Sequence, residues 1–300
     1  MHKKNKHKDG YDLSQLKNVL PELEPFVFVN TFGKETIDFS KPEAVKALNT
    51  ALLKAHYDIS FWEFPNSYLC PAIPGRVDYV HYISDILKRS HIKENIKVLD
   101  IGTGANCIYP LLGNREYDWQ FIGTDISEKA LKTAKKIIVK NELAQVIGLR
   151  HQPDKASIFN NVIAETDKFS ITMCNPPFYK SEAEALEATT KKLKGLGHAT
   201  GEFIRNFSGQ SQELWFQGGE KAFLHTYLYE SSLHKTNCFW YTSLVSNKDN
   251  VKSIYKSLKK LNATGVKTIE MKLGNKISRV VAWTFLTPEE QKEWTLNEAI

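Results

Sequence analysis

Two glycines and a distant acidic residue form the first part of the sequence that could bind a ligand. Gly102 and Gly104 directly follow an apolar stretch, 96–101, whose composition predicts a buried strand. Glycines in this place let the backbone turn tightly and approach a ligand closely. Asp125 ends the next predicted strand, 21 residues after Gly104. This spacing matches an acid that binds the ribose hydroxyls of an adenosine-containing cofactor.

The same loop lacks the third glycine of dinucleotide-binding loops, which allows a pyrophosphate to sit on the helix N-terminus. Cys107 stands at that position and is followed by Ile-Tyr-Pro. A loop without a phosphate cradle suits S-adenosylmethionine, whose tail is an amino acid. The pattern therefore favours S-adenosylmethionine over a dinucleotide.

A second chemical segment, the tetrad Asn175, Pro176, Pro177 and Phe178, follows a predicted strand at 169–174. Ligands of open α/β sheets bind outside the carboxyl ends of the strands, where this tetrad should lie. The Asn175 side-chain oxygen and the Pro176 carbonyl could accept hydrogen bonds from an exocyclic NH₂, while the prolines fix the local backbone. Phe178 could stack on the base, which contributes roughly 1–3 kcal/mol in comparable sites. The tetrad predicts methyl transfer to an amino nitrogen, without a metal or a covalent nucleophile.

Alternating strands and helices must position these loops. The order indicates a parallel sheet with right-handed crossovers, and Ser127 is placed to cap one of the helices. The interruption at 180–219 does not fit this alternation and resembles a functional insertion. The predicted strands are 96–101, 120–124, 146–149, 169–174, 237–245, 268–273 and 279–286, the last two as an antiparallel pair.

The first 90 residues are expected to form a helical extension ahead of a domain at 91–300. Ser40 and Glu43 have capping-box spacing and predict a helix over 44–55. Another amphipathic helix is expected after Gly75. The basic tip, residues 1–8, is expected to be a frayed and solvated terminus.

The composition excludes several classes of protein. Hydrophobic residues make up 42% and charged residues 25% of the 300 residues, which is typical of soluble globular proteins rather than disordered or fibrous ones. No apolar run approaches the roughly 18 residues of a membrane helix. The four cysteines are widely spaced, so we expect free thiols, no metal and a cytoplasmic setting. A net charge of +6 permits a polyanionic partner.

The block from Asp100 to Gly113, DIGTGANCIYPLLG, and the tetrad NPPF resemble the bacterial 23S ribosomal RNA adenine-N6 methyltransferases of the RlmF type. The likeness includes 41–49, 73–80, 218–220 and 278–283, and spans about residues 10–285. It implies a Rossmann-like class I fold that uses S-adenosyl-L-methionine, with a mostly parallel seven-stranded sheet and a helical N-terminal extension. Eukaryotic relatives of this family methylate an adenine in a small nuclear RNA and in messenger RNA.

The resemblance also implies roles for individual residues. Arg76 would contact the carboxylate end of the cofactor, and Asp125 would hold its ribose. The tetrad would be catalytic, and the 1–90 extension would form the RNA-binding side. The further cofactor-binding positions are Asp100, Gly102, Gly104, Asn106 and Ala156, the last through its backbone or packing. The RNA-binding positions are Lys180, Lys191, Lys192, Lys194, Arg205 and Arg279.

The expected function is methyl transfer to N6 of one adenine in large-subunit ribosomal RNA, free or in an assembly intermediate. Nothing in the sequence requires a dimer, so we expect a monomer. Three alternatives stay open at this point. An amide NH₂ could use the same tetrad, which allows glutamine methylation in a protein. DNA adenine methylation and RNA binding without turnover are the other two.

Overall fold

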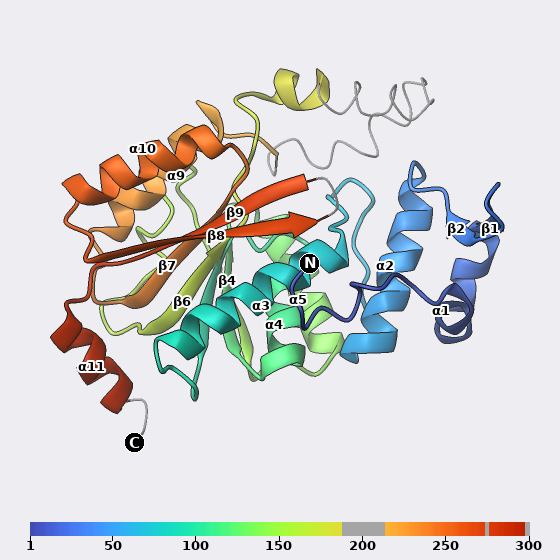
Figure 1. Cartoon of the computed structure of the whole chain (residues 1–300), viewed down its shortest axis with the longest axis horizontal. Helices are drawn as coiled ribbons and strands as arrows, with labels where there is room; N and C mark the ends of the chain where they lie inside the picture. The colour runs from blue at the N-terminus through green and yellow to red at the C-terminus, as the bar shows by residue number, and fades with distance from the viewer. Residues whose placement is uncertain (188–213, 274–275, 298–300) are drawn as a thin grey trace.

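A seven-stranded sheet with the order β5-β4-β3-β6-β7-β9-β8 is the centre of the computed structural model, which describes residues 1–187, 214–273 and 276–297 (Figure 1). The pairs from β5 to β7 are parallel, whereas β9 is antiparallel to both of its neighbours. The strands are β3 (Lys97–Ile101), β4 (Gln120–Asp125), β5 (Ile147–His151), β6 (Phe169–Cys174), β7 (Cys238–Val245), β8 (Gly265–Leu273) and β9 (Lys276–Thr284). This arrangement confirms the predicted fold class.

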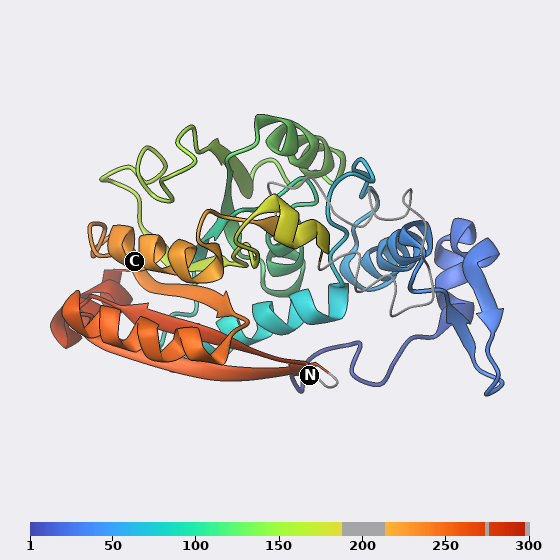
Figure 2. The same ribbon diagram turned by 90° about the horizontal axis from the view of Figure 1, so that it is seen from above.

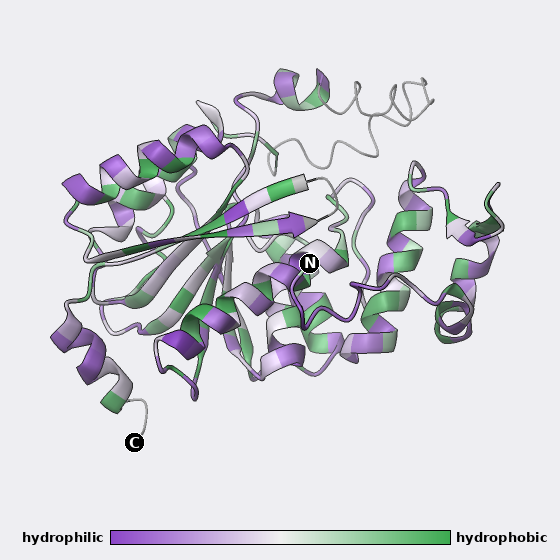
Figure 3. Ribbon diagram, in the orientation of Figure 1, coloured by the Kyte–Doolittle hydropathy of each residue, from purple (hydrophilic) through white to green (hydrophobic). Residues whose placement is uncertain are grey.

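Helices cover both faces of the sheet (Figure 2). Successive residues of β3 point to opposite faces, so Val98 packs in one hydrophobic cluster and Leu99 in the other. The first cluster includes α3 (Ile73–Arg89), α4 (Ile108–Tyr117) and α5 (Glu128–Lys140). The second includes α9 (Gly219–Ser231) and α10 (Lys248–Lys260). In Figure 3, hydrophilic and hydrophobic residues alternate along α10, as expected of a helix with one buried face.

The N-terminal extension packs against the first cluster through α2 (Pro42–Tyr57). In Figure 1, α1 (Leu13–Val19) and α2 lie at the end of the molecule opposite α11 (Pro288–Asn297), whereas α3 lies beside the sheet. Buried leucines of α1 and α2, for example Leu16 and Leu48, belong to the same hydrophobic core. The remaining elements of the extension are the 3₁₀ helix η1 (Pro21–Phe26) and the antiparallel strands β1 (Val27–Val29) and β2 (Glu35–Ile37).

The starts of α2 and α3 differ from the sequence prediction, whereas the predicted cap of α5 is confirmed. The capping box at Ser40 is wrong, because Lys41 is the N-cap of α2 and the Ser40 hydroxyl donates to Asp38 instead. Helix α3 begins at Ile73, ahead of Gly75, since a proline is tolerated in the first turn of a helix. The predicted cap at Ser127 is confirmed, with its hydroxyl 3.2 Å from the Ala130 nitrogen.

The expectation of a frayed basic tip is also wrong. His2, Asn5 and His7 are buried, while the lysines between them are exposed. The backbone N–H of His2 donates to Asp78 (2.9 Å), and the Asn5 amide donates to the Pro74 carbonyl (2.9 Å). These contacts hold the first turns of α3, the helix that carries Arg76.

Acidification should loosen this tip. Burial lowers the pKa of His7 and of His81 to about 4, whereas both titrate near 6.5 in an unfolded chain. Between these values the unfolded state binds more protons, so the free energy of unfolding falls as the pH falls. We expect a His7→Gln/His81→Gln variant to lose less of this free energy between pH 7 and pH 5 than the parent protein, as measured by urea denaturation.

A His91→Gln variant is the control, because His91 is exposed. It should keep the parental pH dependence. Equal losses in the parent and in the double variant would contradict the assignment.

Candidate active site

The carboxyl ends of β3, β4 and β6 meet at a cavity of about 180 Å³. The order of the sheet reverses at β3, which lies between β4 and β6, and such a switch point is where open α/β sheets bind ligands. Gly102 and Gly104 line the cavity after β3, Asp125 at the end of β4, and Asn175 and Pro177 after β6. The structure thus brings the three predicted segments together.

The loop after β3 needs its glycines. Gly102 has φ 73° and Gly104 has φ 65°, in the left-handed region that side chains disfavour. The backbone N–H groups of Gly102 and Thr103 both donate to the Thr124 carbonyl at 2.9 Å, which closes the turn. A Cβ at Gly102 would meet no atom within 4 Å. The backbone there faces open space, so a ligand can lie directly against it.

Asp125 is held by backbone donors on both carboxylate oxygens. One oxygen accepts from the Gly104 N–H (2.9 Å) and the other from the Ser127 N–H (2.8 Å). Burial raises the pKa of Asp125, and these two donors counteract part of that rise. A carboxylate has about four lone-pair sites in all, so Asp125 can accept from a ligand as well. This chemistry fits the two vicinal hydroxyls of a ribose.

Arg76 lies across the cavity, in the first turn of α3. Its guanidinium donates to the Tyr109 hydroxyl at 2.9 Å, and both residues line the cavity. A guanidinium held in this way can bind a carboxylate. Asn106 also lines the cavity, and its amide donates to the Leu69 carbonyl (3.2 Å), which fixes the loop between α2 and α3.

Two predicted cofactor positions lie elsewhere than expected. Asp100 is fully buried and does not line the cavity, and neither of its carboxylate oxygens has a hydrogen-bond partner among the described residues. Burial raises its pKa to about 7. Ala156 does not line the cavity either, although its neighbours Lys155 and Ser157 do. The roles assigned to Asp100 and Ala156 stay predictions.

The residues of the tetrad differ in how far they are exposed to solvent. Asn175 is half-buried, Pro176 is buried, and the Phe178 side chain is 36% exposed. No described residue hydrogen-bonds the Asn175 side chain, so its amide is available to a ligand. The backbone is anchored on both sides, since the Cys174 N–H donates to the Tyr79 hydroxyl (3.3 Å) and the Phe178 N–H to the Leu214 carbonyl (3.1 Å).

Sequence reasoning missed several aromatic residues that line the cavity, among them Trp215, Phe216 and Phe223. These three come from the end of the insertion and the start of α9, where the periodicity carried no strand signal. Phe216 and Phe223 pack edge to face, with ring centroids 5.4 Å apart. Aromatic residues on either side of Gly218-Gly219 were the signal that could have found them.

The predicted RNA-binding residues are only partly described. Lys180 is exposed, and Arg279 is half-buried on β9, 3.8 Å from a carboxylate oxygen of Glu270. Lys191, Lys192, Lys194 and Arg205 lie outside the described residues. The assigned RNA contacts stay predictions.

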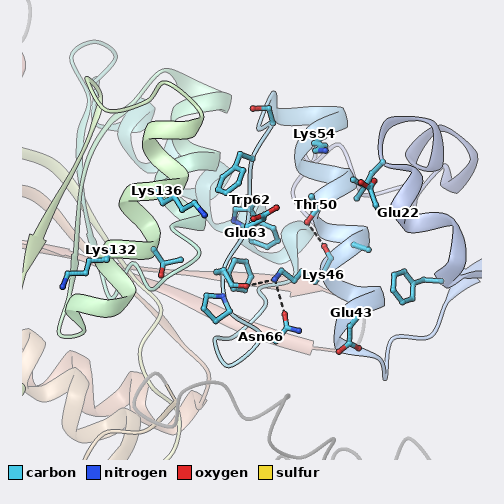
Figure 4. Close-up of a pocket in the computed structure, with 18 residues that line it drawn as sticks. Glu22, Glu43, Lys46, Thr50, Lys54, Trp62, Glu63, Asn66, Lys132 and Lys136 are labelled. Carbon is cyan, nitrogen blue, oxygen red and sulfur yellow. Dashed lines mark hydrogen bonds between the residues drawn. The ribbon is translucent and has the colours of Figure 1, made fainter.

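A larger hollow of about 820 Å³ lies between α2 and α5 (Figure 4). We call it the basic groove, for Lys46 and Lys54 of α2 and Lys132 and Lys136 of α5. Aromatic residues of the α2–α3 loop, Phe61, Trp62 and Phe64, also line it. Three glutamates, Glu22, Glu43 and Glu63, accompany the four lysines.

One loop forms a wall of both the basic groove and the cofactor cavity. The Trp62 indole N–H donates to the Asn106 carbonyl at 2.9 Å, and Tyr68 and Leu69 of the same loop line the cavity. Lys46 donates to the Phe64 carbonyl (2.6 Å), which fastens α2 to this loop. The loop therefore connects the extension directly to the cavity.

In the described parts of the chain, no group of His, Cys, Asp and Glu could hold a metal ion. All four cysteines are free thiols. None of the described helices is long and apolar enough to cross a membrane.

Comparison with known proteins gives consistent matches. A family model described as RNA methyltransferase matches residues 1–287. The chain is 49% identical to the ribosomal RNA large subunit methyltransferase F of Flavobacterium psychrophilum, over 98% of this chain and 96% of the relative. It is 45% identical to the protein of the same name from Yersinia enterocolitica, over 98% and 90%.

Solved structures show the same relationship. The human METTL16 catalytic domain in complex with MAT2A 3′UTR hairpin 1 matches with a TM-score of 0.82 and 27% identity, over 96% of both chains. The N-terminal domain of human METTL16 in complex with SAH matches with a TM-score of 0.77 and 26% identity, over 96% of this chain and 99% of the other.

These matches confirm the resemblance seen in the Asp100–Gly113 block and the tetrad. They also agree with the cavity, whose glycine loop, ribose-type acid and guanidinium fit an amino-acid-bearing nucleoside. The chain belongs to the RNA methyltransferase family, and its methyl donor is S-adenosylmethionine.

Proposed function

We propose that this protein transfers a methyl group from S-adenosylmethionine to N6 of one adenine in large-subunit ribosomal RNA. The observation that carries the proposal is the position of Asn175 and Pro177 on the cavity that Gly102, Gly104 and Asp125 also line. An amine-binding segment and a nucleoside-binding loop share one space. The names of the relatives, at 45–49% identity over nearly the whole chain, support the ribosomal substrate.

Different residues around the cavity bind different parts of the cofactor. Asp125 binds the ribose hydroxyls through the free lone pairs of its carboxylate, and Arg76 binds the carboxylate of the methionine part. The backbone at Gly102 faces open space and would allow the cofactor to lie directly against it. When bound, S-adenosylmethionine would supply an activated methyl group: its S–CH₃ bond would break as the bond from the methyl carbon to N6 forms, S-adenosylhomocysteine would leave, and N6 would lose a proton to water. The protein aligns the acceptor with this methyl group. Alignment of this kind can contribute about 7–11 kcal/mol to catalysis.

The tetrad aligns the acceptor. The Asn175 side-chain oxygen and the Pro176 carbonyl each accept a hydrogen bond from the adenine NH₂. These two bonds orient the amino nitrogen and direct its lone pair at the methyl group. Phe178, at the exposed end of the tetrad, stacks on the base, which enters the cavity unpaired.

The N-terminal extension provides the RNA-binding side. The basic groove lies where α2 faces α5, and its lysines bind phosphates while its aromatic residues pack against sugars or bases. The loop that it shares with the cofactor cavity leads the strand toward the tetrad. Lys180, Lys191, Lys192, Lys194, Arg205 and Arg279 add further contacts with the RNA.

The protein acts as a monomer in the cytoplasm, on naked large-subunit RNA or on an assembly intermediate. Glutamine methylation in a protein and DNA adenine methylation could use the same tetrad. RNA binding without turnover could use the same basic groove. The family description and the relatives' names favour RNA methylation over all three.

An Asn175→Ala variant tests the proposed chemistry. It should lose roughly 10²–10³ of the methylation rate constant, by analogy with removal of one positioned hydrogen-bonding group, while its affinity for RNA stays close to that of the parent. Single-turnover transfer of labelled methyl groups and filter binding measure the two quantities. Asn160→Ala is a matched control, since Asn160 is exposed and lies outside the cavity lining. Unchanged methylation by the Asn175 variant would end the proposal.

Charge reversal in the basic groove tests the RNA-binding side. A Lys132→Glu/Lys136→Glu variant should bind RNA more weakly and reduce the slope of log K against log salt by about 2, one for each lost phosphate contact. Its affinity for S-adenosylmethionine should be unchanged. Lys252→Glu/Lys256→Glu, on the exposed side of α10, makes the same change of charge on the opposite face of the sheet. Equal effects from both pairs would show that only net charge matters.

A further inference from the structure

Trp215 has a buried indole N–H without a hydrogen-bond partner in the described parts of the chain. The indole N–H groups of the tryptophans in the sheet and in the α2–α3 loop have hydrogen-bond partners. The indole of Trp62 donates to the Asn106 carbonyl, that of Trp240 to Ser90 and that of Trp283 to Ser231. Buried N–H groups are rarely left unpaired, because each loses its hydrogen bond to water. Trp215 also lines the cavity, so a ligand there can supply the missing acceptor.

The position of Trp215 is fixed by the tetrad itself. The backbone N–H groups of Phe178 and Tyr179 both donate to the Leu214 carbonyl, at 3.1 and 3.0 Å. The Phe216 N–H donates back to the Tyr179 carbonyl at 3.0 Å, so Trp215 lies in a short parallel bridge with Tyr179. Trp215 lines the same cavity as Asn175 and Pro177. Backbone hydrogen bonds thus place the indole next to the segment that aligns the acceptor.

The chemistry of the acceptor supplies a matching group. The amino group of adenine donates hydrogen bonds, and the tetrad offers two acceptors for it. The ring nitrogens on either side of the amino group, N1 and N7, are acceptors. The Trp215 indole N–H and the Asn175 side-chain oxygen, on two residues that line the same cavity, complement this pattern. Guanine presents an oxygen in place of the amino group, which would face the Asn175 and Pro176 oxygens without a proton between them.

We propose that Trp215 binds the target base directly, through a hydrogen bond from its indole N–H to a ring nitrogen next to the amino group. This inference rests on the proposed function and extends it, because it assigns base selection to a residue outside the tetrad. The cofactor contacts are assigned to Arg76 and Asp125, so the affinity for S-adenosylmethionine should not depend on the indole N–H.

Trp215→Phe removes the N–H and keeps an aromatic ring. The substrate is a synthetic RNA segment that contains the methylated adenine, mapped beforehand by nucleoside mass spectrometry with the parent protein. We expect kcat/KM to fall about 10-fold, which corresponds to one hydrogen bond to a buried partner. The dissociation constant of S-adenosylmethionine, measured by calorimetry on the same sample, should be unchanged and shows that the variant is folded.

Substituted bases separate a hydrogen bond from a packing effect. The same RNA is prepared with 1-deazaadenosine or with 7-deazaadenosine at the target position. With the analogue that lacks the bonded nitrogen, parent and Trp215→Phe should have the same kcat/KM. The other analogue should keep the 10-fold difference. Trp240→Phe is the control, because its indole bonds Ser90 outside the cavity lining, and it should respond to neither analogue.

Three results would overturn the inference. Trp215→Phe could be as active as the parent, could show the same loss with all three bases, or could lose affinity for S-adenosylmethionine. Failure of the proposed function has a different signature. In that case the parent protein itself methylates no RNA, and the inference falls with it.

Discussion

The two hydrogen bonds that Asp125 accepts are the contact on which the site depends. One comes from the loop after β3 and the other from the start of α5, so a single carboxylate joins the two elements that surround the cofactor. The parallel register places these elements at the same edge of the sheet, because Ile101 pairs with Thr124 and with Cys174. The acid, the glycine loop and the tetrad then lie within one cavity without any long-range adjustment.

The N-terminal extension supplies parts of the cavity that the sheet does not provide. Arg76 belongs to α3, and the first turns of that helix are tied down by Asn5 and His2 from the far N-terminus. The loop between α2 and α3 forms one wall of the cofactor cavity and one wall of the basic groove. Binding of RNA to the extension and binding of the methyl donor to the sheet therefore involve the same short loop, which offers a physical route for coupling between the two substrates.

Local sequence signals predicted the sheet and most of the cavity. Strand periodicity placed Gly102, Asp125 and Asn175 at strand ends, and the parallel order brought them together. The buried N-terminal tip and the basic groove could not be predicted from local sequence, because they depend on contacts between residues far apart in the chain. The buried tip depends on Asp78, which lies 76 residues from His2. The basic groove depends likewise on where tertiary contacts place α2 relative to α5. Trp215 escaped notice because its neighbours in space, Tyr179 and Asn175, lie across the insertion.

Transfer of labelled methyl groups to unmodified large-subunit ribosomal RNA tests the central claim most directly, with DNA and total protein assayed in parallel. Nucleoside mass spectrometry then identifies the product in whichever pool takes up label. The account predicts N6-methyladenosine at a single position of the RNA, and no label in DNA or protein. Label that appears only in protein, as methylglutamine, would keep the fold and the cofactor but contradict the assigned substrate.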